Sequence, residues 1–112
     1  MRRGEIWWAA LPSPKGSSPG YRRPVVVVQG NEFNESRIQT VVVAAITSNL
    51  HLVEAPGNFA VERKGTGLPK KSVVNVSQLL TINKDLLESR MGALANRSVH
   101  SLNEGLRLVL GL

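Results

Sequence analysis

The feature that most constrains the fold of this chain is a pair of continuous apolar runs rich in valine. Pro24–Gln29 (PVVVVQ) holds four consecutive valines and is followed by Gly30, and Ile38–Thr47 (IQTVVVAAIT) is a longer run with a polar end. Valine loses rotamer freedom in a helix but packs well on a pleated surface. Because both runs are short and bounded by proline, glycine or polar residues, they predict buried β-strands.

Further short segments with strand character lie on either side of these runs. Four more strands are predicted, at Gly4–Leu11, Asn58–Glu62, Ser72–Ser77 and Arg90–Ala95. Asn31–Ser36 predicts one helical turn with Asn31 as its cap and Phe33 facing inward, and Asn83 caps a second turn that ends at Leu87. No helical pattern long enough for a parallel crossover separates the strands, so the sheet is predicted to be antiparallel.

The last segment has the periodicity of a helix. Four apolar residues recur there at spacings of three, four and three: Val99, Leu102, Leu106 and Val109. Such spacing places them on one helix face, and Asn96 or Ser98 supplies the N-terminal cap. The prediction is therefore a mainly β protein, a small antiparallel barrel followed by a C-terminal α-helix, folded as one domain over residues 1–112.

Composition excludes several classes of protein. The chain has 112 residues, of which 42% are hydrophobic and 20% charged, so it holds enough apolar material for one core. No apolar run approaches the ~20 residues of a membrane span, and residues 1–5 lack the apolar stretch of a signal peptide, so a cytoplasmic protein with no membrane association is expected. The absence of cysteine excludes disulfides and thiol nucleophiles. Carboxylates are few and scattered, so no metal or other cofactor is expected.

The distribution of charge predicts an anionic partner. Fourteen Lys and Arg residues against eight Asp and Glu residues give a net charge of +6 at pH 7. Residues 1–71 carry ten basic and five acidic side chains, which is +5, and residues 72–112 carry four and three, which is +1. The anion site is therefore expected in the first two-thirds of the chain.

Two features in that part of the chain suit phosphate chemistry. The connection Pro12–Arg23 holds three prolines and two glycines, ends in two arginines, and has the length of a functional loop. A guanidinium matches phosphate oxygens bidentately, and RNA supplies its own nucleophile, the 2′-hydroxyl. The longest predicted strand ends at two residues that carry hydroxyls, Thr47 and Ser48. From the residues alone, a surface salt bridge for Arg23 and a plain strand role for Thr47 stay open, as does an acid or base role for His51.

With these residues in place, the sequence resembles the MazF/PemK family of bacterial toxins, ribonucleases that cut messenger RNA without a ribosome. The resemblance rests on the segments RRGEIWWAAL, Lys15–Gln29, Thr40–Asn49 and Ser72–Leu87, which are specific in combination. It implies a homodimer with the SH3-like barrel that MazF, PemK and CcdB share. It also implies metal-independent, sequence-selective cleavage of single-stranded RNA to a 2′,3′-cyclic phosphate and a 5′-hydroxyl. A cognate acidic, MazE-like antitoxin would neutralise the toxin by occupying the RNA groove.

The resemblance also assigns roles to residues. The arginine that immediately precedes a proline in the family's motif corresponds to Arg23, and the strand-end threonine corresponds to Thr47, which makes these two the predicted catalytic residues. Gln78 corresponds to a family glutamine and is predicted to contact RNA. Only one of the adjacent residues Trp7 and Trp8 can lie in the core, since successive strand residues face opposite sides. The other could stack on RNA bases, but a core or dimer contact is favoured for the tryptophans. The remaining predicted RNA contacts are Lys15, Ser18, Tyr21, Arg22, Ser48, Lys70 and Lys71.

The sequence departs from the family at two positions that carry acids in several members, Ser18 and Ser77. The general base is therefore open between a water held by Ser18, Glu5 and His51. Alternatively, the arginine alone lowers the cost of ionising the 2′-oxygen. In either case slow or narrowly selective cleavage is expected. Two other functions remain alternatives. The same small barrel serves in a toxin that binds and poisons DNA gyrase, and a plain single-strand nucleic-acid-binding module would share the basic loops.

Overall fold

Six β-strands and a C-terminal helix dominate the computed structural model, which describes residues 1–13, 16 and 21–112. The strands are β1 (Glu5–Leu11), β2 (Tyr21–Val27), β3 (Thr40–Thr47), β4 (Phe59–Val61), β5 (Ser72–Asn83) and β6 (Leu87–Ala93). The helices are α1 (Asn31–Asn34), η1 (Leu50–Glu54), η2 (Lys84–Leu86) and α2 (Asn96–Leu110). This arrangement confirms the predicted mainly β fold with a C-terminal helix. No helix of the described residues is long and apolar enough to cross a membrane.

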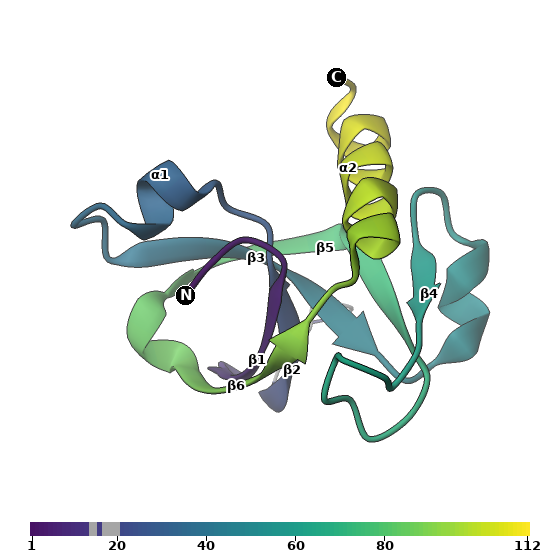
Figure 1. The fold of residues 1–112 in the computed structure, drawn as a ribbon, viewed down its shortest axis with the longest axis horizontal. Helices are drawn as coiled ribbons and strands as arrows, with labels where there is room; N and C mark the ends of the chain where they lie inside the picture. The colour runs from purple at the N-terminus through teal and green to yellow at the C-terminus, as the bar shows by residue number, and fades with distance from the viewer. Residues whose placement is uncertain (14–15, 17–20) are drawn as a thin grey trace.

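The strands form one curled antiparallel sheet, a half-barrel with the order β4-β5-β3-β2-β1-β6 (Figure 1). The loop 62–71, which follows β4, lies against β6 at the other edge of the sheet. The Ala93 N–H donates to the Gly65 carbonyl at 3.1 Å, and Gly67 lies so close to Met91 that a Cβ there would overlap the Met91 carbonyl. This loop therefore covers the seam between the two edge strands.

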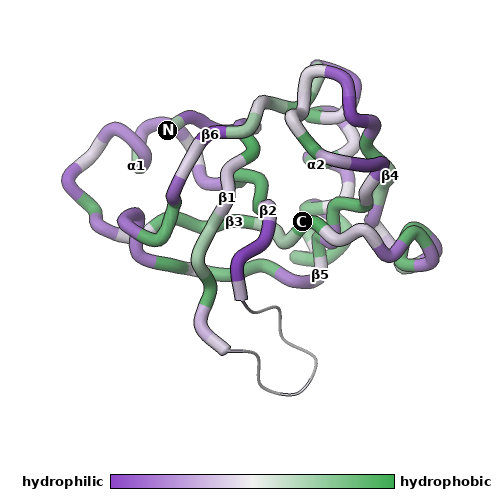
Figure 2. The backbone as a smooth tube through the Cα atoms, turned by 90° about the horizontal axis from the view of Figure 1, so that it is seen from below, coloured by the Kyte–Doolittle hydropathy of each residue, from purple (hydrophilic) through white to green (hydrophobic). Residues whose placement is uncertain are grey.

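Both faces of the central strands are buried, which explains the run of four valines. Val25 and Val27 lie in one apolar cluster with Trp7 packed against it, whereas Val26 lies in a second cluster with Leu102 of α2. The apolar segments are concentrated in the sheet, and the start of β2 is hydrophilic (Figure 2). Trp7 is thus the tryptophan that contributes to this core, as the alternation of strand residues predicts.

Three predictions about the α1 turn and the helix caps were wrong. Phe33 is 59% exposed, because Asn34 is the buried residue of α1 and its amide donates to the Gln29 carbonyl at 2.9 Å. Gly30, not Asn31, is the N-cap of α1. The N-cap of α2 is Ala95, with no side-chain bond, so neither Asn96 nor Ser98 caps that helix.

The apolar stripe predicted for the C-terminal helix is buried only in part. Leu102 is fully buried, but Val109 is 40% exposed, because the last turn of the helix projects beyond the sheet (Figure 1). Only the first part of the stripe therefore packs on the core.

Strand β5 continues past a bulge to Asn83 and is therefore twice as long as the predicted Ser72–Ser77. Ala45 pairs with Asn75 but Ala44 pairs with Leu79, so residues 76–78 have no partners in β3. Asn58 holds the bulge: its Oδ1 accepts from the Val76 N–H at 2.9 Å and its Nδ2 donates to the Leu52 carbonyl at 2.8 Å. Gln78 therefore lies in the bulge.

Gly105 marks a close approach between α2 and the turn before β4. A Cβ added at Gly105 would lie 2.5 Å from the Gly57 carbonyl oxygen. In an unhindered helix, alanine in place of glycine adds about 1 kcal/mol of stability. Here we expect Gly105→Ala to lower the free energy of unfolding by about 2 kcal/mol, because the helix must move away. Urea unfolding followed by circular dichroism measures this change.

Gly30→Ala is the matched control, since a Cβ at Gly30 meets nothing within 4 Å and the expected change is under about 0.5 kcal/mol. A Gly105→Ala protein at least as stable as the parent would contradict the packing described.

Candidate active site

The strands β2 and β3 stop pairing at Pro24. Their antiparallel ladder runs from Val27 and Val43 to Val25 and Ala45, and it ends there. Proline has no N–H to donate to a neighbouring strand, so the ladder cannot continue regularly through Pro24. Extending the register by two residues would place Arg23 opposite Thr47. The two predicted catalytic residues therefore come from the ends of neighbouring strands.

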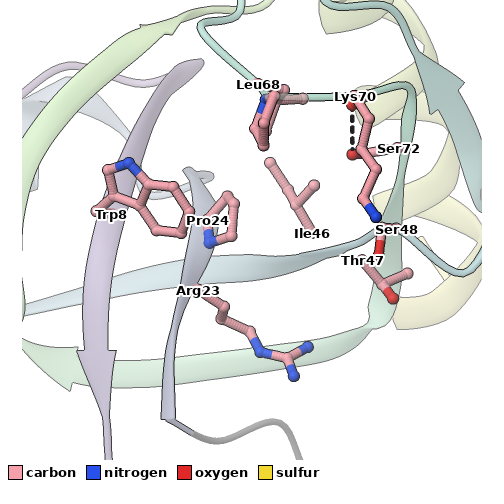
Figure 3. A pocket seen from close by; sticks show the side chains of 10 residues that line it. Trp8, Arg23, Pro24, Ile46, Thr47, Ser48, Leu68, Lys70 and Ser72 are labelled. Carbon is pink, nitrogen blue, oxygen red and sulfur yellow. Dashed lines mark hydrogen bonds between the residues drawn. The ribbon is translucent and has the colours of Figure 1, made fainter.

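A pocket of about 230 Å³ opens at this end of the two strands. It is lined by ten residues: Trp8, Arg23, Pro24, Ile46, Thr47, Ser48, Leu68, Pro69, Lys70 and Ser72. Figure 3 shows Arg23 and Thr47 on neighbouring strands and Trp8 beside Pro24, with the Arg23 guanidinium pointing away from both. The structure thus brings four of the predicted site residues to one pocket, Arg23, Thr47, Ser48 and Lys70.

The Thr47 hydroxyl is held in place by the turn that follows β3. Its oxygen accepts the Asn49 N–H at 3.1 Å, and the Asn49 side chain accepts the His51 N–H at 3.2 Å and caps η1. A hydroxyl has one donor and two acceptor positions, so the O–H of Thr47 can still donate. It is suited to a ligand with acceptor oxygens.

The pocket carries positive charge. Arg23 and Lys70 both line it, and none of its ten lining residues is Asp or Glu. The backbone of Arg23 is fixed by pairing with Ala9 of β1. Behind Lys70, the hydroxyl of buried Ser72 donates to the Lys70 carbonyl at 2.9 Å. Both cations are thus attached to fixed backbone, and the charge favours an anionic ligand.

Several predicted RNA contacts lie outside this pocket. The Arg22 guanidinium lies over the Trp8 ring, 4.3 Å from its centroid, and bonds Glu88 at 2.7 Å. Lys71 pairs with Glu62 at 3.4 Å. Tyr21 is 67% exposed at the start of β2 and Gln78 lies in the bulge, so neither is among the lining residues. Lys15 and Ser18 lie outside the described residues.

Two of the candidate general bases also lie away from the pocket. His51 is exposed in η1 and does not line it. Glu5 accepts from the Arg2 backbone N–H at 2.9 Å, the Trp7 indole N–H at 3.2 Å and the Arg90 guanidinium at 2.9 Å. Burial raises the pKa of Glu5, but these donors and the Arg90 charge outweigh it and hold the pKa below its usual value. A carboxylate stabilised in this way is a weak base.

Sequence reasoning missed the apolar side of the pocket and Ser72. Leu68 and Pro69 belong to a loop whose sequence has no hydrophobic periodicity. They line the pocket because the loop 62–71 packs against β6. A serine that begins a strand carries no signal of its own. Within the described residues, no group of three or more His, Cys, Asp or Glu side chains is placed to hold a metal ion.

The structure is a small curled antiparallel sheet that brings an arginine, a lysine and a fixed threonine hydroxyl to one pocket. Residues 2–110 match the family model described as the PemK-like, MazF-like toxin of type II toxin-antitoxin systems. The chain belongs to this toxin family, which confirms the resemblance seen in its sequence.

Two sequence relatives agree with this assignment, and two solved structures share the fold. The endoribonuclease MazF2 of Mycobacterium bovis is 46% identical over 112 residues, covering all of this chain and 98% of the relative. The endoribonuclease MazF of Staphylococcus saprophyticus is 33% identical, with coverage of 100% and 92%. A mycobacterial endoribonuclease solved in complex with its cognate antitoxin has a TM-score of 0.82 at 22% identity, with coverage of 100% and 96%. MazF from Deinococcus radiodurans also scores 0.82, at 16% identity and coverage of 100% and 97%.

The lowered pKa of Glu5 predicts a pH-dependent contribution to stability. Because the folded-state pKa lies below the unfolded value of about 4.3, the contribution is present above that pH and is lost as the pH falls through the folded pKa. We expect Glu5→Gln to lower the free energy of unfolding by about 1 kcal/mol at pH 7, with the difference disappearing at lower pH. Urea unfolding at a series of pH values measures it.

Glu35→Gln is the control, because its pair with Arg2 is mostly exposed and such pairs contribute little. A Glu5→Gln deficit that stays constant down to about pH 3 would show that ionisation of Glu5 is not its source.

Proposed function

We propose that this chain is the toxin of a type II toxin–antitoxin system and acts as an endoribonuclease on single-stranded RNA. The observation that carries the proposal is that Arg23 and Thr47, far apart in the sequence, line one pocket that also holds Lys70 and no carboxylate. The names of the 46% and 33% identical relatives support the same activity.

In the proposed reaction, the 2′-oxygen of one nucleotide attacks the adjacent phosphorus. The bond from phosphorus to the 5′-oxygen of the next nucleotide breaks, which leaves a 2′,3′-cyclic phosphate and a 5′-hydroxyl. The 2′-hydroxyl loses its proton and the departing 5′-oxygen gains one. Arg23 stabilises the charge that develops on the phosphoryl oxygens, and Thr47 donates its O–H to one of them. Ser48 and Lys70 help hold the strand.

The proposed partners follow from charge and from the family. A net charge of +6 complements both an RNA backbone and an acidic antitoxin segment, and one similar structure is a complex with a cognate antitoxin. We place the protein in the bacterial cytoplasm as a homodimer, with the antitoxin covering the RNA-binding surface.

The roles of Arg23 and Thr47 predict a specific loss of activity. We expect Arg23→Ala and Thr47→Val each to lower the rate of RNA cleavage at least ~100-fold, because each removes a donor to the charged transition state. The melting temperature should change little, since neither residue belongs to the apolar clusters. The assay is single-turnover cleavage of mixed single-stranded RNA in excess chelator, with analysis of the fragment ends.

Two matched variants control for the chemistry of the substitutions. Thr40→Val changes the threonine at the other end of β3, and Arg37→Ala removes a cation that lines a different pocket. Both should cleave within about threefold of the parent. Normal cleavage by Arg23→Ala or Thr47→Val would remove that residue from the mechanism. Intact RNA together with a loss of DNA supercoiling by gyrase would instead identify a gyrase poison.

The position of the candidate bases predicts the pH dependence of cleavage. Neither Glu5 nor His51 lines the pocket, so neither is expected to act as the acid or the base of the reaction. Single-turnover rates should rise with pH without a bell-shaped maximum, and His51→Ala should leave them within about threefold. A pronounced bell whose acidic limb disappears in His51→Ala would contradict this account.

A further inference from the structure

The lysine side chains of the chain differ in what holds them. Lys71 pairs with Glu62 at 3.4 Å, and the Lys84 ammonium donates to two backbone carbonyls at 3.2 and 3.4 Å. Among residues 1–13, 16 and 21–112, the ammonium groups of Lys64 and Lys70 have neither an ion pair nor a hydrogen bond. An amine that is not engaged elsewhere can react without first giving up a partner, so these two are the candidates for chemistry at a lysine.

Of these two lysines, Lys70 lies in the pocket with Arg23 and Thr47. Its backbone is fixed, because its carbonyl accepts the hydroxyl of Ser72 at 2.9 Å and Ser72 is buried at the start of β5. In Figure 3 its side chain extends from this anchored loop toward Ser48, which follows β3. The Lys70 amine is therefore carried by fixed backbone into a pocket that favours an anion.

The same pocket can hold a small molecule that contains a phosphate group. The Arg23 guanidinium and the Thr47 hydroxyl suit phosphate oxygens, and no Asp or Glu belongs to the lining. Ile46 and Leu68 add apolar surface, which suits a short hydrocarbon group. The volume of about 230 Å³ is below the roughly 300 to 1,000 Å³ of sites for drug-sized ligands, so the ligand is small. An acyl phosphate, in which a short carboxylic acid is joined to phosphate, has all of these properties.

We propose that Lys70 is an acylation site, at which the pocket holds an acyl phosphate by its phosphate group and the Lys70 nitrogen takes the acyl group. The unprotonated nitrogen attacks the carbonyl carbon and forms the new N–C bond. The C–O bond to the phosphate then breaks, inorganic phosphate leaves, and the proton lost by the nitrogen passes to water. Arg23 and Thr47 contribute by holding the leaving phosphate next to the amine, which raises the rate over that of an amine in solution.

Acylation of Lys70 would weaken the hold of the pocket on RNA. An amide carries no charge, so the modification removes one of the two cations in the lining, Arg23 and Lys70. This regulatory effect rests on the proposed ribonuclease function, whereas the acylation itself depends only on the pocket. The toxin would thus be less active when acyl phosphates are abundant.

The first test maps acetyl groups on the full chain after treatment with acetyl phosphate. Peptide mass spectrometry over time gives a rate for each lysine. We expect Lys70 to react at least ~5-fold faster than Lys64, because Lys64 lines a different pocket, which includes Glu62. The Lys70 rate should saturate as the concentration of acetyl phosphate is raised, and added inorganic phosphate should slow it. The Lys64 rate should rise linearly and should not respond to inorganic phosphate.

Two controls separate binding of the phosphate group from the reactivity of the amine. Acetic anhydride contains no phosphate, so it should acetylate Lys70 and Lys64 at rates within about threefold of each other. With acetyl phosphate, Arg23→Ala should bring Lys70 down to the rate of Lys64, whereas Arg37→Ala, in another pocket, should leave the preference intact. Equal, linear rates at Lys70 and Lys64 in the parent, or an undiminished preference in Arg23→Ala, would overturn the acylation site.

The second test measures the effect of acetylation on nucleic-acid binding. The probe is single-stranded DNA of mixed sequence, which has no 2′-hydroxyl and is not cut. Loss of one phosphate contact should lower the slope of log Kd against log salt by about 0.7 after acetylation. Lys70→Arg keeps the charge but has no amine to acylate, so acetyl phosphate should change neither its slope nor its rate of RNA cleavage. Acetylated Lys70 with an unchanged slope and an unchanged rate of RNA cleavage would overturn the regulatory role.

These outcomes separate the acylation site from the function on which its effect rests. An untreated protein that cuts no RNA contradicts the ribonuclease function, and the acetyl map and the salt slope still decide the acylation site. Normal cleavage of RNA together with no preference for Lys70 overturns the acylation site alone.

Discussion

The pairing of β2 with β3, and its end at Pro24, is the constraint on which the rest of the site depends. A shift of register by one residue would exchange the two faces of β2 and would turn the Arg23 side chain away from Thr47. The position of Arg23 relative to Thr47 therefore depends on this register. Where proline ends the ladder, the strands leave room for a ligand between an arginine and a hydroxyl.

The proposed cleavage of RNA depends more on where the pocket residues lie than on a side chain that gains or loses a proton. The lining of the pocket combines two cations with a hydroxyl fixed by a backbone N–H, and it includes no carboxylate. Glu5, which the sequence analysis named as a candidate base, instead forms an ion pair with Arg90 that links β1 to β6. An RNA substrate carries its own nucleophile, so a site that orients the phosphate and stabilises its charge is sufficient for the proposed reaction.

The sequence predicted the strands and the two central residues, but not the walls of the pocket. Runs such as Val25–Val28 identify strands because both of their faces are buried, and the family resemblance assigned Arg23 and Thr47. The bulge at residues 76–78 and the return of Leu68 depend on contacts between distant segments, which local propensity does not encode. The predicted cap of α2 was wrong because the path of the chain between β6 and the helix decides where the helix begins. The chain stays extended up to Ala95, which is the N-cap.

The central claim is that Arg23 and Thr47 act on one phosphate, and a double-mutant cycle on RNA cleavage tests it most directly. Single-turnover rates would be measured for the parent, Arg23→Ala, Thr47→Val and the double variant. Groups that share one transition state are strongly coupled, so the double variant should be little slower than the slower single variant. Losses that multiply, as for independent sites, would contradict the account.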